Sequence, residues 1–87
     1  MPDLEGRKKI LGVHSKDKKL SDDVNLEEIA KRCLGMSGAD LANVMNESAI
    51  VSARRKKPKT DTEDIYDAID RIQIGLEKKN GKYSEDR

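Results

Sequence analysis

The chain has 87 residues, of which 40% are charged and 34% hydrophobic, with two tyrosines and neither Phe nor Trp. A domain of this size buries only about 60–65% of its unfolded surface, so we expect one small, marginally stable domain or part of a larger protein. The 18 basic and 17 acidic residues nearly balance, which excludes an electrostatic basis for binding nucleic acid or anionic membrane. No apolar run is long enough to span a bilayer. This composition favours an all-helical fold.

The first helix is expected from Leu4 to about Ser15, with Asp3 as its N-cap. Helical spacing predicts that five positions face inward, Arg7 through its stem only: Leu4, Arg7, Ile10, Leu11 and His14. A charged connector follows, and Leu20 interrupts it as an apolar plug for the core.

A second helix is expected after Asn25, which can cap it and form a capping box with Glu28. Its apolar face consists of Leu26, Ile29, Ala30 and Cys33. Cys33 is therefore interpreted as a core residue, and a single cysteine excludes an internal disulfide. Gly35 is expected to end this helix.

The third helix is the central element, expected from Ser37 to about Arg55. Ser37 and Asp40 have the spacing of a capping box, and the residues that follow are apolar on most of the circumference, which is typical of a helix with neighbours on several sides. Gly38 is unusual, because glycine in a first turn costs about 1 kcal/mol relative to alanine. Two interpretations stay open: packing against another helix, or close approach of a ligand to the backbone.

A basic run, 54–57, ends the third helix and is interpreted as a solvated helix end, with Pro58 preventing continuation. Thr60 or Thr62 is expected to cap the fourth helix. Its apolar stripe has helical spacing and comprises Ile65, Ala68, Ile69, Ile72 and Leu76. Gly75 is expected near its end. The predicted domain is therefore residues 1–76, with 77–87 as a flexible tail or linker.

The sequence lacks catalytic constellations. It has no pair of Cys or His residues at metal-ligand spacing, no Gly-rich phosphate loop ending in Lys-Ser or Lys-Thr, and no set of residues that would form a triad. We therefore expect no enzymatic activity and no metal site in this segment by itself.

Several motifs together carry a family resemblance. They are Pro-Asp-x-x-x-Arg-x-x-Ile-Leu-x-x-His from Pro2, Asn-Leu-Glu-Glu-Ile-Ala from Asn25, and Ser-Gly-Ala-Asp-Leu-Ala-Asn-x-x-Asn-Glu-Ser-Ala from Ser37. In this combination the chain resembles the small helical lid subdomain of AAA ATPases, from Pro2 to about Lys79. The residue pattern at positions 40–49 and the ending Gly-Leu-Glu-Lys-Lys are most similar to those of the FtsH family of ATP-dependent zinc metalloproteases.

The resemblance implies a four-helix lid that covers a nucleotide and couples ATP hydrolysis to substrate unfolding and proteolysis. Matched residue by residue, it implies nucleotide contacts for Ile10 and His14, on the adenine and ribose side, and for Gly38 and Ala39 at the helix start. Many AAA+ proteins carry a phosphate-sensing arginine at that helix start, whereas this chain has Gly38 and Ala39. Phosphate sensing is then expected from the large subdomain and a neighbouring subunit.

The same resemblance implies a parent protein with a large AAA subdomain before this segment and a zinc protease domain after it. Its cofactors would be ATP or ADP with magnesium, contacted by this segment from the lid side only, and zinc in the protease domain. Its partners would be the large subdomain, neighbouring protomers of a hexameric ring and protein substrates. The parent would be anchored in a bacterial, mitochondrial inner or thylakoid membrane, with this domain on the aqueous side.

Two alternatives stay open. One is the lid of a proteasomal or Cdc48-like AAA unfoldase, which shares the general pattern. The other is a free-standing four-helix protein-interaction domain. A functional gene product of only 87 residues would favour the second, and the parent open reading frame on both sides would decide.

Overall fold

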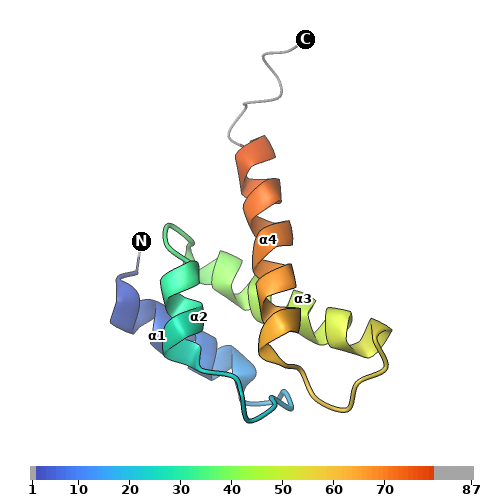
Figure 1. Cartoon of the computed structure of the whole chain (residues 1–87). Coiled ribbons are helices and arrows are strands. Elements are labelled where there is room, and N and C mark those ends of the chain that lie inside the picture. Colours follow the sequence, from blue (N-terminus) through green and yellow to red (C-terminus); the bar gives the residue numbers. More distant parts are fainter. Residues whose placement is uncertain (1, 80–87) are drawn as a thin grey trace.

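The computed structural model describes residues 2–79, with the side chains of residues 2–77. Four helices follow one another along the chain (Figure 1): α1 (Leu4–Ser15), α2 (Leu26–Arg32), α3 (Gly38–Arg54) and α4 (Thr62–Lys79). Within these residues the helices are joined by turns and loops, with a single isolated bridge between Leu20 and Thr60. The all-α, four-helix prediction is confirmed.

Helix α3 is the element that the others share. Both α1 and α4 pack against it, while α2 packs mainly against α1 (Figure 1). The core around α3 is built from aliphatic and sulfur-containing side chains: Leu11, Ile29, Ala30, Cys33, Met36, Leu41, Val44, Met45, Ile65, Ala68 and Ile69. Burying each of the large members stabilises the fold by about 1.5–3 kcal/mol. Leu20 packs against this cluster from the loop, as predicted.

Local capping determines where three helices begin. The carboxylate of Asp3 accepts the Gly6 amide at 2.8 Å, and Ser37 and Asp40 form the full reciprocal box at the start of α3. The Asn25 side chain accepts the amides of residues 27 and 28. These caps confirm the predicted starts of α1, α2 and α3. The Glu28 carboxylate contacts Lys31 instead of completing a box with Asn25.

Cys33 lies in the core as predicted, with no exposed surface. Burial raises the pKa of its thiol to about 11, while the nearby Arg7 and Arg32 guanidinium groups act weakly in the opposite direction. Because the thiol is protonated at neutral pH, Cys33 acts as a small apolar residue.

Arg7 faces inward as predicted, but its burial goes further than predicted, and the inward position predicted for His14 is wrong. Arg7 buries its guanidinium as well as its stem: only 6% of the residue is exposed, and Nε donates to the Ala30 carbonyl at 2.8 Å while Nη1 donates to Pro2. The two carbonyls replace the water that the group loses. His14 is exposed although it lies on the same helical face as Arg7 and Leu11, because Leu11 is the last buried residue of α1 and the helix ends at Ser15.

The predicted cap of α4 is also wrong. Asp61, and neither threonine, caps the helix: its carboxylate accepts the Asp64 amide at 3.0 Å, and the Asp64 carboxylate accepts the Asp61 amide at 3.1 Å. Thr60 is buried and joins the loops, with its hydroxyl 3.0 Å from that of Ser52 and its amide donating to the Lys19 carbonyl. The Thr62 hydroxyl donates to the Asp23 carbonyl.

Helix α4 also runs further than predicted. It continues past Gly75 and past the expected boundary at residue 77 to Lys79. A Cβ atom on Gly75 would meet nothing within 4 Å, so this glycine weakens the helix without ending it. The remainder of the predicted tail, 80–87, lies outside the described residues.

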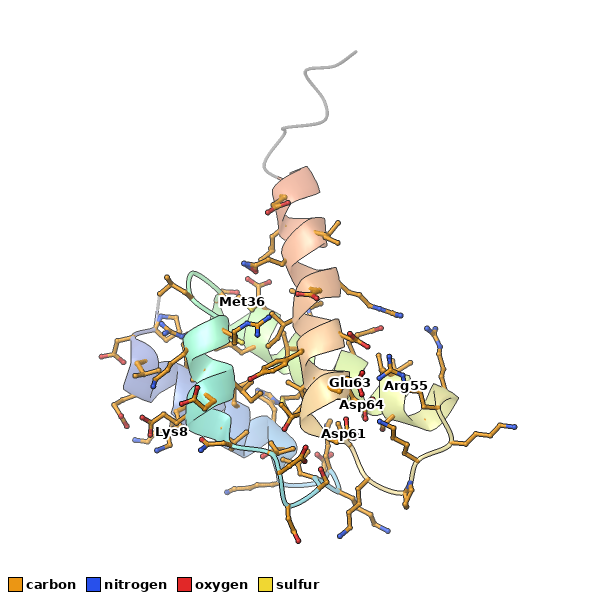
Figure 2. The ribbon with its side chains drawn as sticks, in the orientation of Figure 1. Lys8, Met36, Arg55, Asp61, Glu63 and Asp64 are labelled. Carbon is orange, nitrogen blue, oxygen red and sulfur yellow. The ribbon has the colours of Figure 1, made fainter. Side chains whose placement is uncertain are left out.

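The basic run after α3 forms an ion cluster with the start of α4. Arg55 contacts the carboxylates of Asp64 and Asp67, and Lys57 contacts those of Asp61 and Asp64 (Figure 2). Asp64 is fully buried, so these cations and the Asp61 amide replace its hydration. The interpretation of residues 54–57 as merely a solvated helix end is therefore wrong for Arg55 and Lys57.

The charges in this cluster shift one another's titration. Asp67 and then Asp64 raise the pKa of Arg55, and hydrogen bonding to Asp61 raises that of Lys57. The hydrogen bond from Lys57 lowers the pKa of Asp61 below its ordinary value of 3.8. Because the folded pKa lies below the unfolded one, this pair stabilises the fold above pH 3.8, and the contribution is lost as the pH falls through the folded pKa.

Replacing Asp64 should therefore destabilise the domain. Asp64→Asn removes the charge that Arg55 and Lys57 share, and we expect the free energy of unfolding to fall by about 2 kcal/mol. The matched control is Asp67→Asn, whose side chain is 38% exposed; we expect a loss of at most about 1 kcal/mol there. Urea denaturation measures both, and equal losses would contradict a special role for the buried carboxylate.

Helix α3 ends four residues before Pro58, through its own backbone. The Lys56 amide donates to the Ala53 carbonyl, the Lys57 amide donates to the Ser52 carbonyl, and Lys56 has φ of +58°. This is a Schellman motif, in which the position after the C-cap adopts the left-handed conformation that glycine favours. A lysine there is strained relative to glycine.

Lys56→Gly should therefore stabilise the domain, by about 1 kcal/mol, because it relieves the left-handed strain at an exposed position. Lys56→Ala is the control: it removes the side chain but keeps the Cβ atom, and it should leave the free energy of unfolding nearly unchanged. Thermal and urea denaturation of the three proteins check this. A glycine variant no more stable than the alanine variant would contradict the assignment of strain.

Candidate functional site

The predicted site residues come from two elements, the outer face of α1 and the first turn of α3. Ile10 is half-buried, and a Cβ atom built on Gly38 would lie 3.6 Å from the Ile10 Cδ1 atom. The packing of α1 on α3 thus places Ile10 beside the start of α3. Ile10 and Gly38, which are 28 positions apart in the chain, therefore lie at the same edge of the molecule.

Ile10 and His14 also share a shallow depression of about 340 Å³ on α1. Gly6, Lys9 and Val13 complete its lining. The sequence reasoning missed these three, although Gly6 and Val13 lie four and three residues from Ile10 and could have been found from helical spacing. The depression offers an apolar wall with an imidazole and an ammonium group at its margin.

The start of α3 supplies backbone donors next to this wall. The capping box uses the Ser37 side chain for the Asp40 amide, and this leaves the amides of Gly38 and Ala39 without an intrahelical acceptor. Gly38 is half-buried beside Ile10, and Ala39 is exposed. The Asp40 carboxylate, which accepts the Ser37 amide, lies in the same turn and offsets part of the positive potential there.

The contact at Gly38 bears on its two interpretations. A separation of 3.6 Å is an ordinary van der Waals distance, so Ile10 would tolerate a Cβ atom at this position. Packing within the described residues therefore does not by itself require glycine. The interpretation in which a ligand approaches this backbone from outside stays a prediction.

Together, these groups form a surface that can contact a ligand. Among the residues that the structure describes, no cluster of three His, Cys, Asp or Glu side chains is placed to hold a metal ion. None of the described helices combines the length and apolarity of a membrane span.

Comparison with known proteins identifies the family. Residues 23–67, more than half of the chain, match the family model of the AAA+ lid domain. The chain belongs to the AAA+ lid domain family. The lid identity that the sequence motifs predicted is confirmed, and the edge formed by Ile10, His14 and Gly38 is an edge of that lid.

Several FtsH proteins are relatives of this lid. It is 51% identical over 84 residues to the ATP-dependent zinc metalloprotease FtsH of Sulfurovum sp. (strain NBC37-1), covering 97% of this chain and 12% of that protein. It is 50% identical over 86 residues to FtsH 3 of Synechocystis sp., covering 99% and 14%, and 51% identical over 86 residues to the chloroplastic FTSH 1 of Oryza sativa, covering 99% and 12%. The lid is thus of the FtsH type and spans about an eighth of each relative.

Because the candidate site would contact a nucleotide from one side only, we predict that the isolated lid binds nucleotide weakly. The lid lacks a phosphate cradle and offers an apolar wall, an imidazole and backbone amides from one direction only. We expect the 87-residue chain to bind ATP with a Kd no tighter than about 1 mM. Calorimetry with ATP, and with AMP as the control for base and ribose contacts, measures this. A micromolar Kd would contradict the assignment.

Proposed function

We propose that this lid closes over ATP or ADP in a parent enzyme of the FtsH type, an ATP-dependent zinc metalloprotease, and transmits hydrolysis to substrate unfolding as rigid-body motion. The observation that carries the proposal is the identity of about half over nearly the whole chain to several FtsH proteins. The juxtaposition of Ile10 with Gly38 supports it, because it joins the two predicted nucleotide-contacting segments at one edge.

In this proposal Ile10 packs against the apolar faces of the base and ribose, and His14 supplies a polar contact at their edge. Gly38 and Ala39 present their backbone to the nucleotide from the lid side. Magnesium and the phosphates are held by the large AAA subdomain, and zinc by a separate protease domain. In this proposal the described residues of this chain supply none of their ligands.

The packing supports motion of the lid as one body. Helix α1 is tied to α2 by the buried Arg7 bond to the Ala30 carbonyl, and both α1 and α4 are packed onto α3. A push on the nucleotide-facing edge would thus reach α4 without bending the core, since close-packed interiors transmit strain. Partners would be the large subdomain of the same protein and neighbouring protomers of a hexameric ring, in an enzyme anchored to a membrane.

Two alternatives to an FtsH lid are a proteasomal or Cdc48-like lid and a free-standing interaction domain. The identity of about half to FtsH metalloproteases from bacteria and chloroplasts favours an FtsH lid over a proteasomal or Cdc48-like one. A free-standing interaction domain would require a functional product limited to this segment. Sequencing the parent open reading frame on both sides separates it from the proposed enzyme.

Substitution of Gly38 tests the role of the edge. Gly38→Val should leave the melting temperature of the 87-residue chain nearly unchanged, because valine costs no more than glycine in a helix. In the parent enzyme the added methyl groups would occupy nucleotide space, and we expect the ATPase rate to fall by at least about tenfold. His14→Ala should lower it more mildly, because it removes one contact without blocking the site.

The matched control is Gly75→Val, a second helical glycine whose Cβ would meet nothing within 4 Å. It should leave both the melting temperature and the ATPase rate close to those of the wild type. A Gly38→Val parent with normal ATPase activity would refute the assignment of this helix start. A Gly38→Val chain that fails to fold would return Gly38 to a packing role.

A further inference from the structure

A groove next to the nucleotide-facing edge runs between α1 and the first turn of α2, with a volume of about 490 Å³. It shares Lys9 and Val13 with the depression described above. Gly12, Lys16 and Leu26 line the groove and not the depression. These three positions therefore allow the groove to be perturbed separately.

The floor of the groove is apolar because Gly12 has no side chain. A Cβ atom on Gly12 would lie 3.9 Å from the Leu26 Cδ1 atom, so any larger residue there would cover Leu26. Val13 is 56% exposed along the same wall. The structure thus leaves two aliphatic side chains accessible, at a place where a helix-favouring alanine or leucine would have covered one of them.

The rim of the groove is predominantly basic. Lys8, Lys9 and Lys16 line it, against one carboxylate, that of Glu5. Lys8 (labelled in Figure 2) has its ammonium group 3.5 Å from the Glu27 carboxylate of α2, which neutralises its charge in part. Among the described side chains, no carboxylate forms an ion pair with Lys9 or Lys16. Two exposed cations therefore flank an aliphatic floor, although the net charge of the whole chain is only +1.

We propose that this groove binds an acidic segment of a partner protein, one that places leucine-like side chains on Val13 and Leu26 and carboxylates beside Lys9 and Lys16. Apolar burial would supply affinity, and charge complementarity would supply orientation and association rate. A nucleic acid fits less well, since the lining contains no aromatic ring for a base to stack on.

A designed acidic peptide tests whether the groove binds a segment of this kind. The probe is a 16-residue helical peptide with leucines at i and i+4 spacing flanked by glutamates, titrated into the ¹⁵N-labelled 87-residue chain at low salt. We expect amide shifts confined to the groove, around Lys9, Gly12, Lys16 and Leu26. The same peptide with leucines replaced by alanine, or glutamates by lysine, should bind at least about tenfold more weakly.

Variants of the chain locate the site. Gly12→Met fills the groove at a position where methionine favours the helix, and should weaken binding at least about tenfold without lowering the melting temperature. Lys16→Glu should weaken it by about fivefold, whereas Lys59→Glu, which makes the same charge change at an exposed loop position, should stay within about twofold.

Four results would overturn the proposal. They are a probe that does not bind, an alanine peptide that binds as well as the leucine peptide, a Lys59→Glu effect equal to that of Lys16→Glu, and shifts that lie outside the groove. A fifth would reassign the occupant: if the large ATPase subdomain of the proposed parent enzyme, added in trans, displaces the peptide, the groove belongs to that subdomain and not to an external partner.

Discussion

The structure depends on one constraint, the scarcity of material for a core. With no Phe or Trp, the chain must bury aliphatic and sulfur-containing side chains around a single helix, and α3 serves because it is apolar on most of its circumference. Helices α1 and α4 both pack on it and meet α2 at the margins of the same cluster. A small core of this kind leaves little surplus stability, so polar links at the seams carry more weight than in a larger domain.

These polar contacts lie where two helices meet. Arg7 joins α1 to the end of α2 through the Ala30 carbonyl, and Asp64 joins the start of α4 to the end of α3 through Arg55 and Lys57. Each buries a charged group with its partners in place, an arrangement that destabilises strongly when one partner is removed. The Ser52 and Thr60 hydroxyls add a neutral link at the same corner.

The outer face of α1 carries both candidate surfaces. On one side Ile10 and His14 adjoin the start of α3, where Gly38 presents its backbone. On the other side Gly12 exposes Leu26 between lysines. Gly12 lowers the intrinsic stability of α1, and the burial of Leu11 on the inner side of the helix offsets this loss. If both surfaces are occupied in the parent enzyme, α1 would connect the nucleotide to a partner.

The sequence by itself determined the helices, three of the four caps and the family. These follow from interactions within four residues of one another, such as those of Asp3, Asn25 and Ser37, and from periodicity along one helix. The tertiary structure alone decided the burial of the Arg7 guanidinium, the exposure of His14, and the use of Thr60 in a loop contact that leaves Asp61 to cap α4. It also decided that Ile10 lies beside Gly38 and that Gly12 uncovers Leu26. Periodicity defines an apolar stripe but not its edges, because a neighbouring helix determines where burial ends and which carbonyl or carboxylate a charged group can reach.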